Sequence, residues 1–258
     1  MSEYASSVSR VQARVPEIIT LYWVIKIAST TLGETGADLF SMTWDLGYAV
    51  TIAIFLALFV GSAILKISQD GYRPVTYWLA FTASAIAGTA ISDFIDRTLG
   101  LGYAAGSLLL VALLVLILLG WQKAEGSVRV EDVRSRAGEV WYWLAFLVAN
   151  TLGTAAGDFL ADDMGLGFAM GAVLISSVLL AILLAWYWRW LPNTLLFWLA
   201  FVLTRPFGAT FGDWLTKPLS HGGLALGTAG SSVLFALVVV VAVFWEQRRC
   251  QQQLLVAG

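Results

Sequence analysis

The chain has 258 residues, of which 59% are hydrophobic and only 12% charged, and its mean hydropathy is +0.80. This balance lies outside the range of soluble domains and is typical of a protein that crosses a membrane several times. The net charge of -2 argues against a basic surface for nucleic acid, and the single Cys250 excludes a disulfide or a thiolate metal site within one chain. We therefore expect the lipid bilayer and a small solute as partners, and no nucleic acid.

In chain order, eight apolar segments are long enough to span a bilayer as helices: residues 17–40, 46–66, 74–95, 101–121, 140–160, 166–188, 193–215 and 223–245. Helices are favoured over a barrel because these runs lack two-residue alternation. A charged linker at 122–139 divides the chain into two halves. The sequence predicts one all-α membrane domain over 1–258, built from four helical hairpins at 17–66, 74–121, 140–188 and 193–245.

One motif occurs once in every hairpin: a tryptophan, a glycine ten residues later and an aspartate fifteen residues later. The four copies are Trp23/Gly33/Asp38, Trp78/Gly88/Asp93, Trp143/Gly153/Asp158 and Trp198/Gly208/Asp213. A motif recurring at a fixed register indicates equivalent structural units. Because every copy enters the membrane in the same direction, the repeats are parallel in orientation, not inverted. A ring-like bundle and a pair of related halves both fit this pattern.

The fourfold motif in two-helix units resembles the uncharacterised bacterial inner-membrane proteins built from four tandem repeats, each with two spanning segments and a characteristic tryptophan. The matching positions are Trp23, Trp78, Trp143 and Trp198, and the resemblance covers nearly the whole chain. It implies eight spanning helices and a bacterial inner membrane. It implies no activity, because that family is defined by its repeat.

Basic residues favour one orientation in the membrane. Those near the chain termini or between repeats are Arg10, Arg14, Lys66, Arg73, Lys123, Arg129, Arg134, Arg136, Arg189, Arg248 and Arg249. The turns within repeats carry only Arg97 and Lys217. The positive-inside rule then places both termini in the cytoplasm. The motif tryptophans would lie near the inner interface as aromatic-belt anchors, with the aspartates about 22 Å further toward the outer side.

Small residues indicate where the helices pack. The residue four positions after each motif glycine is also small, which allows close helix contact in lipid; the pairs are Gly33/Ala37, Gly88/Ser92, Gly153/Gly157 and Gly208/Gly212. A helical wheel places these positions on the same stripe as the polar residues Lys26, Glu34, Asn150 and Arg205. The opposite face carries Val24, Ile25, Leu144 and Val148. We expect the polar stripe to face the protein interior and the opposite face to meet lipid.

The candidate site consists of acids inside the membrane, where ionisable residues are functional candidates. Each repeat supplies one aspartate, and Glu34 lies on the same face as Asp38. Carboxylates bind hard ions such as Mn²⁺, Mg²⁺, Ca²⁺ or protons, so Asp38, Asp93, Asp158, Asp213 and Glu34 are candidate substrate and metal ligands.

Other polar residues qualify this hypothesis. Lys26, Arg205 and Asn150 would tune the charge of the acids, and structural ion pairs are the alternative. Arg97 and Lys217 follow Asp93 and Asp213 by four residues and can pair with them. A structural role for the aspartates is the alternative, because the sequence equally fits caps that accept hydrogen bonds from the start of the next helix.

Enzyme signatures are missing from the sequence. There is no nucleophile elbow, HExxH motif, P-loop or dinucleotide fingerprint. A single histidine excludes a bis-histidine haem within one chain. We expect no enzymatic activity and no cofactor. The sequence predicts a transporter of a small cation, either a hard divalent metal ion such as Mn²⁺ or a proton-coupled cation, through the aspartates of the repeats. A non-transporting scaffold or sensor and a pseudo-fourfold channel are the alternatives. A homo-oligomer is compatible with each of them.

Overall fold

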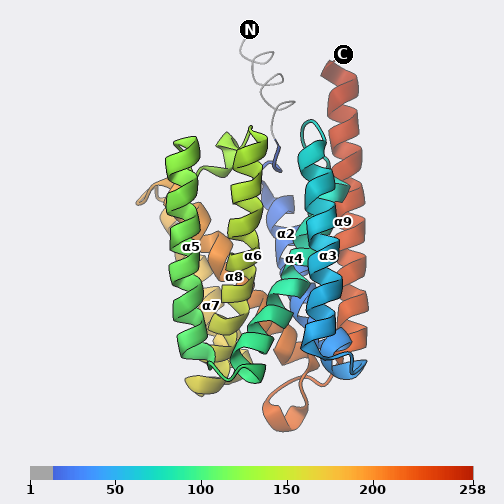
Figure 1. The fold of residues 1–258 in the computed structure, drawn as a ribbon, viewed down its shortest axis with the longest axis vertical. Helices are drawn as coiled ribbons and strands as arrows, with labels where there is room; N and C mark the ends of the chain where they lie inside the picture. Colours follow the sequence, from blue (N-terminus) through green and yellow to red (C-terminus); the bar gives the residue numbers. More distant parts are fainter. Residues whose placement is uncertain (1–13, 258) are drawn as a thin grey trace.

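The computed structural model describes residues 14–257, and every regular element in that part of the chain is a helix (Figure 1). The long helices are α2 (Thr20–Asp38), α3 (Gly47–Ser68), α4 (Pro74–Asp93), α5 (Tyr103–Glu125), α6 (Arg136–Asp158), α7 (Gly167–Tyr187), α8 (Asn193–Thr216) and α9 (Thr228–Ala257). These eight helices confirm the predicted fold class. Arg10, one of the basic residues that indicate the orientation, lies outside the described residues.

Seven of the described helices, α3 to α9, are long and apolar enough to cross a membrane. Helix α2 is more polar because it carries Lys26, Glu34 and Asp38, and all three side chains are buried inside the bundle. The neighbours α4, α8 and α9 pack around α2. Its charged groups are therefore shielded from the surroundings of the protein, as expected for polar residues within a membrane bundle.

The four helices that carry the motif form a closed inner ring in the order α2, α4, α6 and α8, with α8 packing back on α2. The other four are outer helices: α3 packs on α4, α5 on α6, α7 on α8 and α9 on α2. Each outer helix thus packs mainly on the ring helix of the next repeat, and the repeats interlock. Of the two arrangements that fit the sequence, the ring is the one present.

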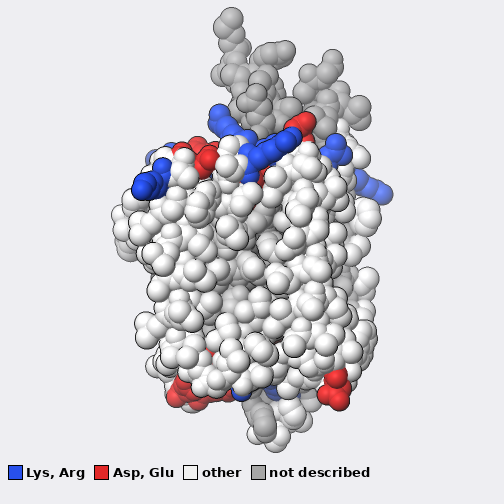
Figure 2. All heavy atoms as spheres, viewed as in Figure 1, with Lys and Arg blue, Asp and Glu red and all other residues white. Residues whose placement is uncertain are grey.

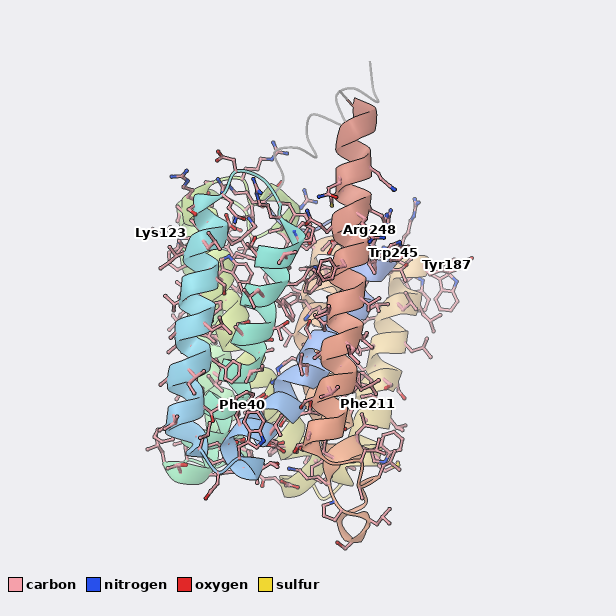
Figure 3. The ribbon with its side chains drawn as sticks, turned by 90° about the vertical axis from the view of Figure 1, so that its right-hand side faces the viewer. Phe40, Lys123, Tyr187, Phe211, Trp245 and Arg248 are labelled. Carbon is pink, nitrogen blue, oxygen red and sulfur yellow. The ribbon has the colours of Figure 1, made fainter. Side chains whose placement is uncertain are left out.

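The repeats point the same way through the bundle, as predicted. Lys123 and Tyr187 lie near the C-terminal ends of α5 and α7, and Trp245 lies in the second half of α9. Figure 3 shows all three toward the same end of the molecule. Phe40 and Phe211 lie toward the opposite end (Figure 3). Helix α2 begins and α9 ends at the first of these ends (Figure 1). We call it the inner end, after the predicted orientation, and the opposite one the outer end.

The surface has the polarity of a membrane domain. In an apolar 18-residue stretch of each helix, the buried share is 22–33% in α3, α5, α7 and α9. The corresponding share is 50–72% in α4, α6 and α8. On the face drawn in Figure 2, charged residues gather at the two ends and leave a largely uncharged band between them. Such a band suits the hydrocarbon layer of a bilayer, with charged groups in the flanking polar regions.

The motif glycines lie where neighbouring ring helices touch. An added Cβ at Gly33 would lie 2.7 Å from Cβ of Ala85, at Gly88 3.0 Å from Cβ of Asn150, and at Gly208 2.8 Å from Cβ of Thr30. At Gly153 it would overlap the side chain of Arg205. Gly157 and Gly212 approach Ala209 and Glu34 in the same way. Glycine is therefore required for the close approach of the ring helices.

Two expectations about exposure need correction. Val24 and Leu144 are exposed as predicted, but Ile25 is fully buried and Val148 is half-buried, because outer helices cover much of the back of the ring. The motif tryptophans are not all interface anchors either, since Trp78 and Trp143 are buried.

These tryptophans pack against outer helices or inner-end segments. The Trp78 indole donates to Oε2 of Glu246 on α9 at 2.7 Å, and the Trp143 ring lies 6.0 Å from that of Phe59 on α3. The Trp198 indole donates to the Val128 carbonyl at 3.1 Å. The tryptophan therefore marks a contact between repeats as well as a depth in the membrane.

Candidate functional site

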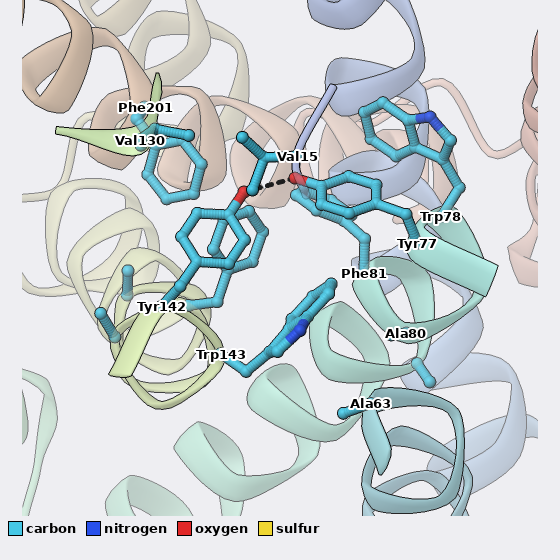
Figure 4. Close-up of a cluster of buried hydrophobic side chains, with 14 of the residues drawn as sticks. Val15, Ala63, Tyr77, Trp78, Ala80, Phe81, Val130, Tyr142, Trp143 and Phe201 are labelled. Carbon is cyan, nitrogen blue, oxygen red and sulfur yellow. Dashed lines mark hydrogen bonds between the residues drawn. The ribbon is translucent and has the colours of Figure 1, made fainter. Parts of the chain in front are cut away.

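The side chains that project into the ring form layers, because residues four apart on a helix share a face. The innermost layer, one residue before the motif tryptophan, contains Tyr22, Tyr77 and Tyr142, all buried. The hydroxyls of Tyr77 and Tyr142 are hydrogen-bonded to each other (Figure 4). We call these three side chains the tyrosine layer; it lies at the inner end of the ring.

The next layer, three residues after the motif tryptophan, holds phenylalanine in three repeats and Lys26 in the first. The Phe146 ring lies 4.8 Å from that of Phe81 and 4.5 Å from that of Phe201. Lys26 Nζ lies 3.8 Å from the ring centre of Phe201, 5.3 Å from that of Phe81 and 6.0 Å from that of Phe146. Among the described residues this nitrogen has no hydrogen-bond partner. We call the three phenylalanines the aromatic cage.

Arg205 crosses the ring one turn further toward the outer end. Its guanidinium donates to the carbonyls of Thr30 at 3.1 Å and Ala85 at 3.3 Å, to Oγ1 of Thr154 at 2.8 Å, and to Thr89. Nη1 also lies 3.5 Å from Oε2 of Glu34. The guanidinium thus links α8 to the other three ring helices. Its contact with Glu34 is the kind of contact through which Arg205 would tune the charge of an acid. Asn150 differs, because it donates to Ser84 at 2.9 Å between α6 and α4.

The outer layer contains the four aspartates, which form two ion-pair clusters. In the first, Arg97 Nε lies 3.3 Å from Oδ1 of Asp93, and Nη2 lies 3.3 Å from Oδ2 of Asp158. The predicted pair with Asp93 is confirmed. The second contact, to the aspartate of the next repeat, could not be inferred from spacing on one helix.

The second cluster has the same plan. Lys217 Nζ lies 3.1 Å from Oδ1 of Asp213 and 2.9 Å from Oδ2 of Asp38, again joining its own repeat to the next around the ring. Lys217 directly follows the last residue of α8. Burial by itself lowers the pKa of Lys217, but the carboxylates of Asp213 and Asp38 outweigh it and raise the pKa above the ordinary lysine value. The lysine is therefore protonated in this cluster.

The aspartates of the first three repeats do not cap the next helix. The N-termini of α3, α5 and α7 have no side-chain cap. Instead, the first three ring helices continue beyond the aspartate as a π-helical turn, at Leu39–Thr43, Phe94–Thr98 and Phe159–Asp163. Single π-helical turns occur frequently at functional sites. The structural alternative for the aspartates is therefore ion pairing between repeats.

Negative charge is in excess at this end of the ring. Five buried carboxylates, those of Glu34 and the four aspartates, face three basic side chains, Arg97, Arg205 and Lys217. Two negative charges remain if every group is ionised. Oδ2 of Asp93 is buried without a hydrogen-bond partner in the described chain. Within that same part of the chain, no group of three or more His, Cys, Asp or Glu is placed to hold a metal ion.

Two polar clusters near the inner end were missed by sequence reasoning. Glu139 accepts from Arg14 at 2.7 Å and from Lys66 at 2.9 Å, and Glu246 accepts from Tyr72 at 2.9 Å as well as from Trp78. No local spacing indicates these contacts, because the partners are far apart in the chain. The aromatic cage did have a signal: superposing the four repeats places Lys26 where the others have phenylalanine.

The fold and the ring define an eight-helix membrane protein made of four tandem repeats. Comparison with protein families identifies it further: the model described as Repeat of Unknown Function (DUF347) matches residues 21–72, 76–127, 141–190 and 196–250. The chain belongs to this family, and the tandem-repeat family inferred from the tryptophan motif is confirmed. Comparison with curated proteins and with solved structures finds no match.

Proposed function

We propose that this protein is a transporter, not an enzyme, and that it moves a small cation along the axis of the inner ring. One observation carries the proposal: five buried carboxylates and three basic side chains lie together at the outer end of the ring. Uncompensated charge within a membrane is costly and is retained mainly at functional sites. A bound cation would remove this cost.

The excess of two charges suits either two protons or one divalent ion such as Mn²⁺. Arg97 and Lys217 already occupy the space between the aspartates. An incoming metal ion must therefore displace one of these bases, whereas protons can bind the free carboxylate oxygens directly. This arrangement supports the exchange of a cation for protons at the same carboxylates.

The closed inner half of the axis favours a carrier over a channel. Tyr77, Tyr142, Phe81 and Phe146 are fully buried, and together with Lys26 they fill the ring on the inner side of Arg205. Passage of a solute requires these layers to separate. The distribution of Lys and Arg supports cytoplasmic termini, so that the aspartates face the outer side. The family resemblance supports a bacterial inner membrane.

A non-transporting scaffold or sensor is the second candidate, and the ion pairs favour it. All four aspartates have a basic partner, and these contacts link neighbouring repeats. In that case the charges would serve only to hold the ring together.

Flux measurements distinguish the two candidates. Purified protein in proteoliposomes is given a panel of metal ions, protons and organic cations, with a pH-sensitive dye inside the vesicles. The transporter predicts protein-dependent uptake of at least one cation, lost in Asp93→Asn and Asp213→Asn. If well-folded wild-type protein gives no flux for any cation, the scaffold or sensor is the remaining candidate function.

A further inference from the structure

The aromatic cage surrounds the deepest charged residue of α2. Lys26 is fully buried, lies on the ring axis side of α2, and meets phenylalanines from the other three ring helices. An amine without a hydrogen-bond partner is costly to bury. The faces of aromatic rings are the groups that attract an ammonium ion in such a place. Three of them converge on this nitrogen.

We propose that the aromatic cage is an ammonium-binding site on the transport path, that the cargo is a small organic ammonium ion, and that Lys26 occupies the cage in the empty protein. The proposal rests on the proposed transport function and names the substrate class of the same path.

The chain's own amines indicate how such a cargo binds at both ends of this path. At the outer end, Lys217 places a primary ammonium 2.9 Å from Asp38 and 3.1 Å from Asp213. In the cage, Lys26 places its nitrogen 3.8 Å from the ring centre of Phe201. Twelve residues separate Lys26 from Asp38 on α2, a distance of about 18 Å. A mobile ammonium ion would first displace Lys217, then pass the Arg205 guanidinium that crosses the ring, and finally displace Lys26.

The chemistry of the layers favours an organic ammonium over a metal ion. Divalent ions such as Mg²⁺ need several oxygen ligands and lose water reluctantly. The cage offers aromatic faces, and the described chain has no cluster of acids placed for a metal. Ammonium groups bind both carboxylates and aromatic faces. These groups lie at the two ends of this stretch of the axis, on either side of Arg205.

The first test uses the cavity left by shortening Lys26. Lys26→Ala removes the atoms from Cγ to Nζ, which correspond to n-propylammonium. We expect n-propylammonium to raise the Tm of purified Lys26→Ala saturably. Lys26→Met refills the space and should not respond. In the Lys26→Ala background, Phe201→Leu should weaken the apparent affinity by about tenfold.

Phe207→Leu is the matched control, because Phe207 is on the same helix but stacks on Phe211, 5.4 Å away, outside the cage. It should leave the affinity unchanged. An equal response of Lys26→Ala and Lys26→Met, or equal effects of the two phenylalanine variants, would overturn the cage assignment.

The second test uses wild-type protein and does not depend on the folding of any variant. Proteoliposomes are given radiolabelled tetramethylammonium, which cannot cross lipid as a neutral amine, and n-propylammonium is added as a competitor. Protein-dependent uptake that the competitor reduces supports the proposal. If Mn²⁺ or protons move and no ammonium ion does, the substrate class is wrong and the proposed transport stands. If no cation moves, both fail.

Discussion

At the scale of residues, the fourfold ring carries a twofold pattern of charge. Arg97 and Lys217 lie nineteen residues after the motif tryptophans of the second and fourth repeats. The first and third repeats have Met42 and Asp162 at that register. Each base therefore serves two aspartates, and the loss of one base leaves two acids without a partner.

The Lys217 cluster provides a test of charge balance. Lys217→Met leaves Asp38 and Asp213 facing each other, and we expect the free energy of unfolding to fall by about 1–3 kcal/mol, since the cluster is only partly exposed. Adding Asp213→Asn should restore part of this loss by removing one acid. Thermal unfolding of the single and double variants in detergent measures both effects. A double variant less stable than Lys217→Met would show that repulsion between Asp38 and Asp213 is not the cause of the loss.

The transport role of the acids is tested by removing charge while keeping shape. Asp→Asn is made singly at positions 38, 93, 158 and 213. We expect at least two of the four variants to lose transport while the protein still folds. Glu34→Gln should impair transport as well, because Glu34 lies 3.5 Å from Arg205 on the ring axis. Asp45→Asn, in an exposed turn, is the control and should transport normally. Flux in proteoliposomes and elution on size exclusion are the measurements; unchanged flux in every folded variant would rule out the carboxylate site.

At the scale of helices, glycine sets the distance between ring neighbours. The glycine of α2 contacts α4, that of α4 contacts α6, that of α6 contacts α8, and that of α8 contacts α2. A single enlarged position therefore disturbs the closure of the whole ring.

Matched glycine substitutions test this closure. Gly33→Ala brings a Cβ to 2.7 Å from Cβ of Ala85, so α2 and α4 must separate. We expect a drop of about 1–3 kcal/mol in the free energy of unfolding. Gly61→Ala is the control, because Gly61 lies inside α3 with no atom within 4 Å of the added Cβ. That variant should be neutral or more stable by up to about 1 kcal/mol. Equal Tm values for the two variants would refute the contact.

The limits of sequence reasoning are clearest at this scale. Hydropathy predicted the eight helices, and the repeated motif predicted that the four repeats share one orientation. Both properties depend on the sequence of the segments themselves. The ring helix on which each outer helix packs was not predictable, because a short turn lets the outer helix pack on either of two neighbouring ring helices. Ile25 was misassigned because an apolar side chain suits lipid and an outer helix equally well.

The candidate site divides in the same way. The aspartates stood out because a charge in an apolar segment is unusual, and Arg97 was within reach on the same helix. The contact from Arg97 to Asp158 depends on which repeats are neighbours in space. The cage phenylalanines are ordinary residues of an apolar segment, and only their convergence on Lys26 distinguishes them.

At the scale of the whole molecule, the two ends of the ring differ. At the inner end, Glu139 on α6 binds Lys66 on α3, and Glu246 on α9 binds Trp78 on α4. These contacts join the two halves of the chain. The outer end instead holds the excess of carboxylates. The predicted orientation therefore places the acidic end of the ring outside the cell.

Cysteine labelling tests this orientation directly. In a Cys250→Ser background, single cysteines are introduced in the turns at the outer end, at the exposed positions Asp45, Leu99, Asp163 and Ser220. Asp96 is unsuitable because its side chain is buried. We expect an impermeant thiol reagent to label these four sites in intact cells, because the basic residues near the inner end favour the cytoplasm. A cysteine at the exposed Arg129, near the inner end, should react only after the cells are opened. Labelling at Arg129 together with protection of the four turns would invert the orientation and place the acidic end in the cytoplasm.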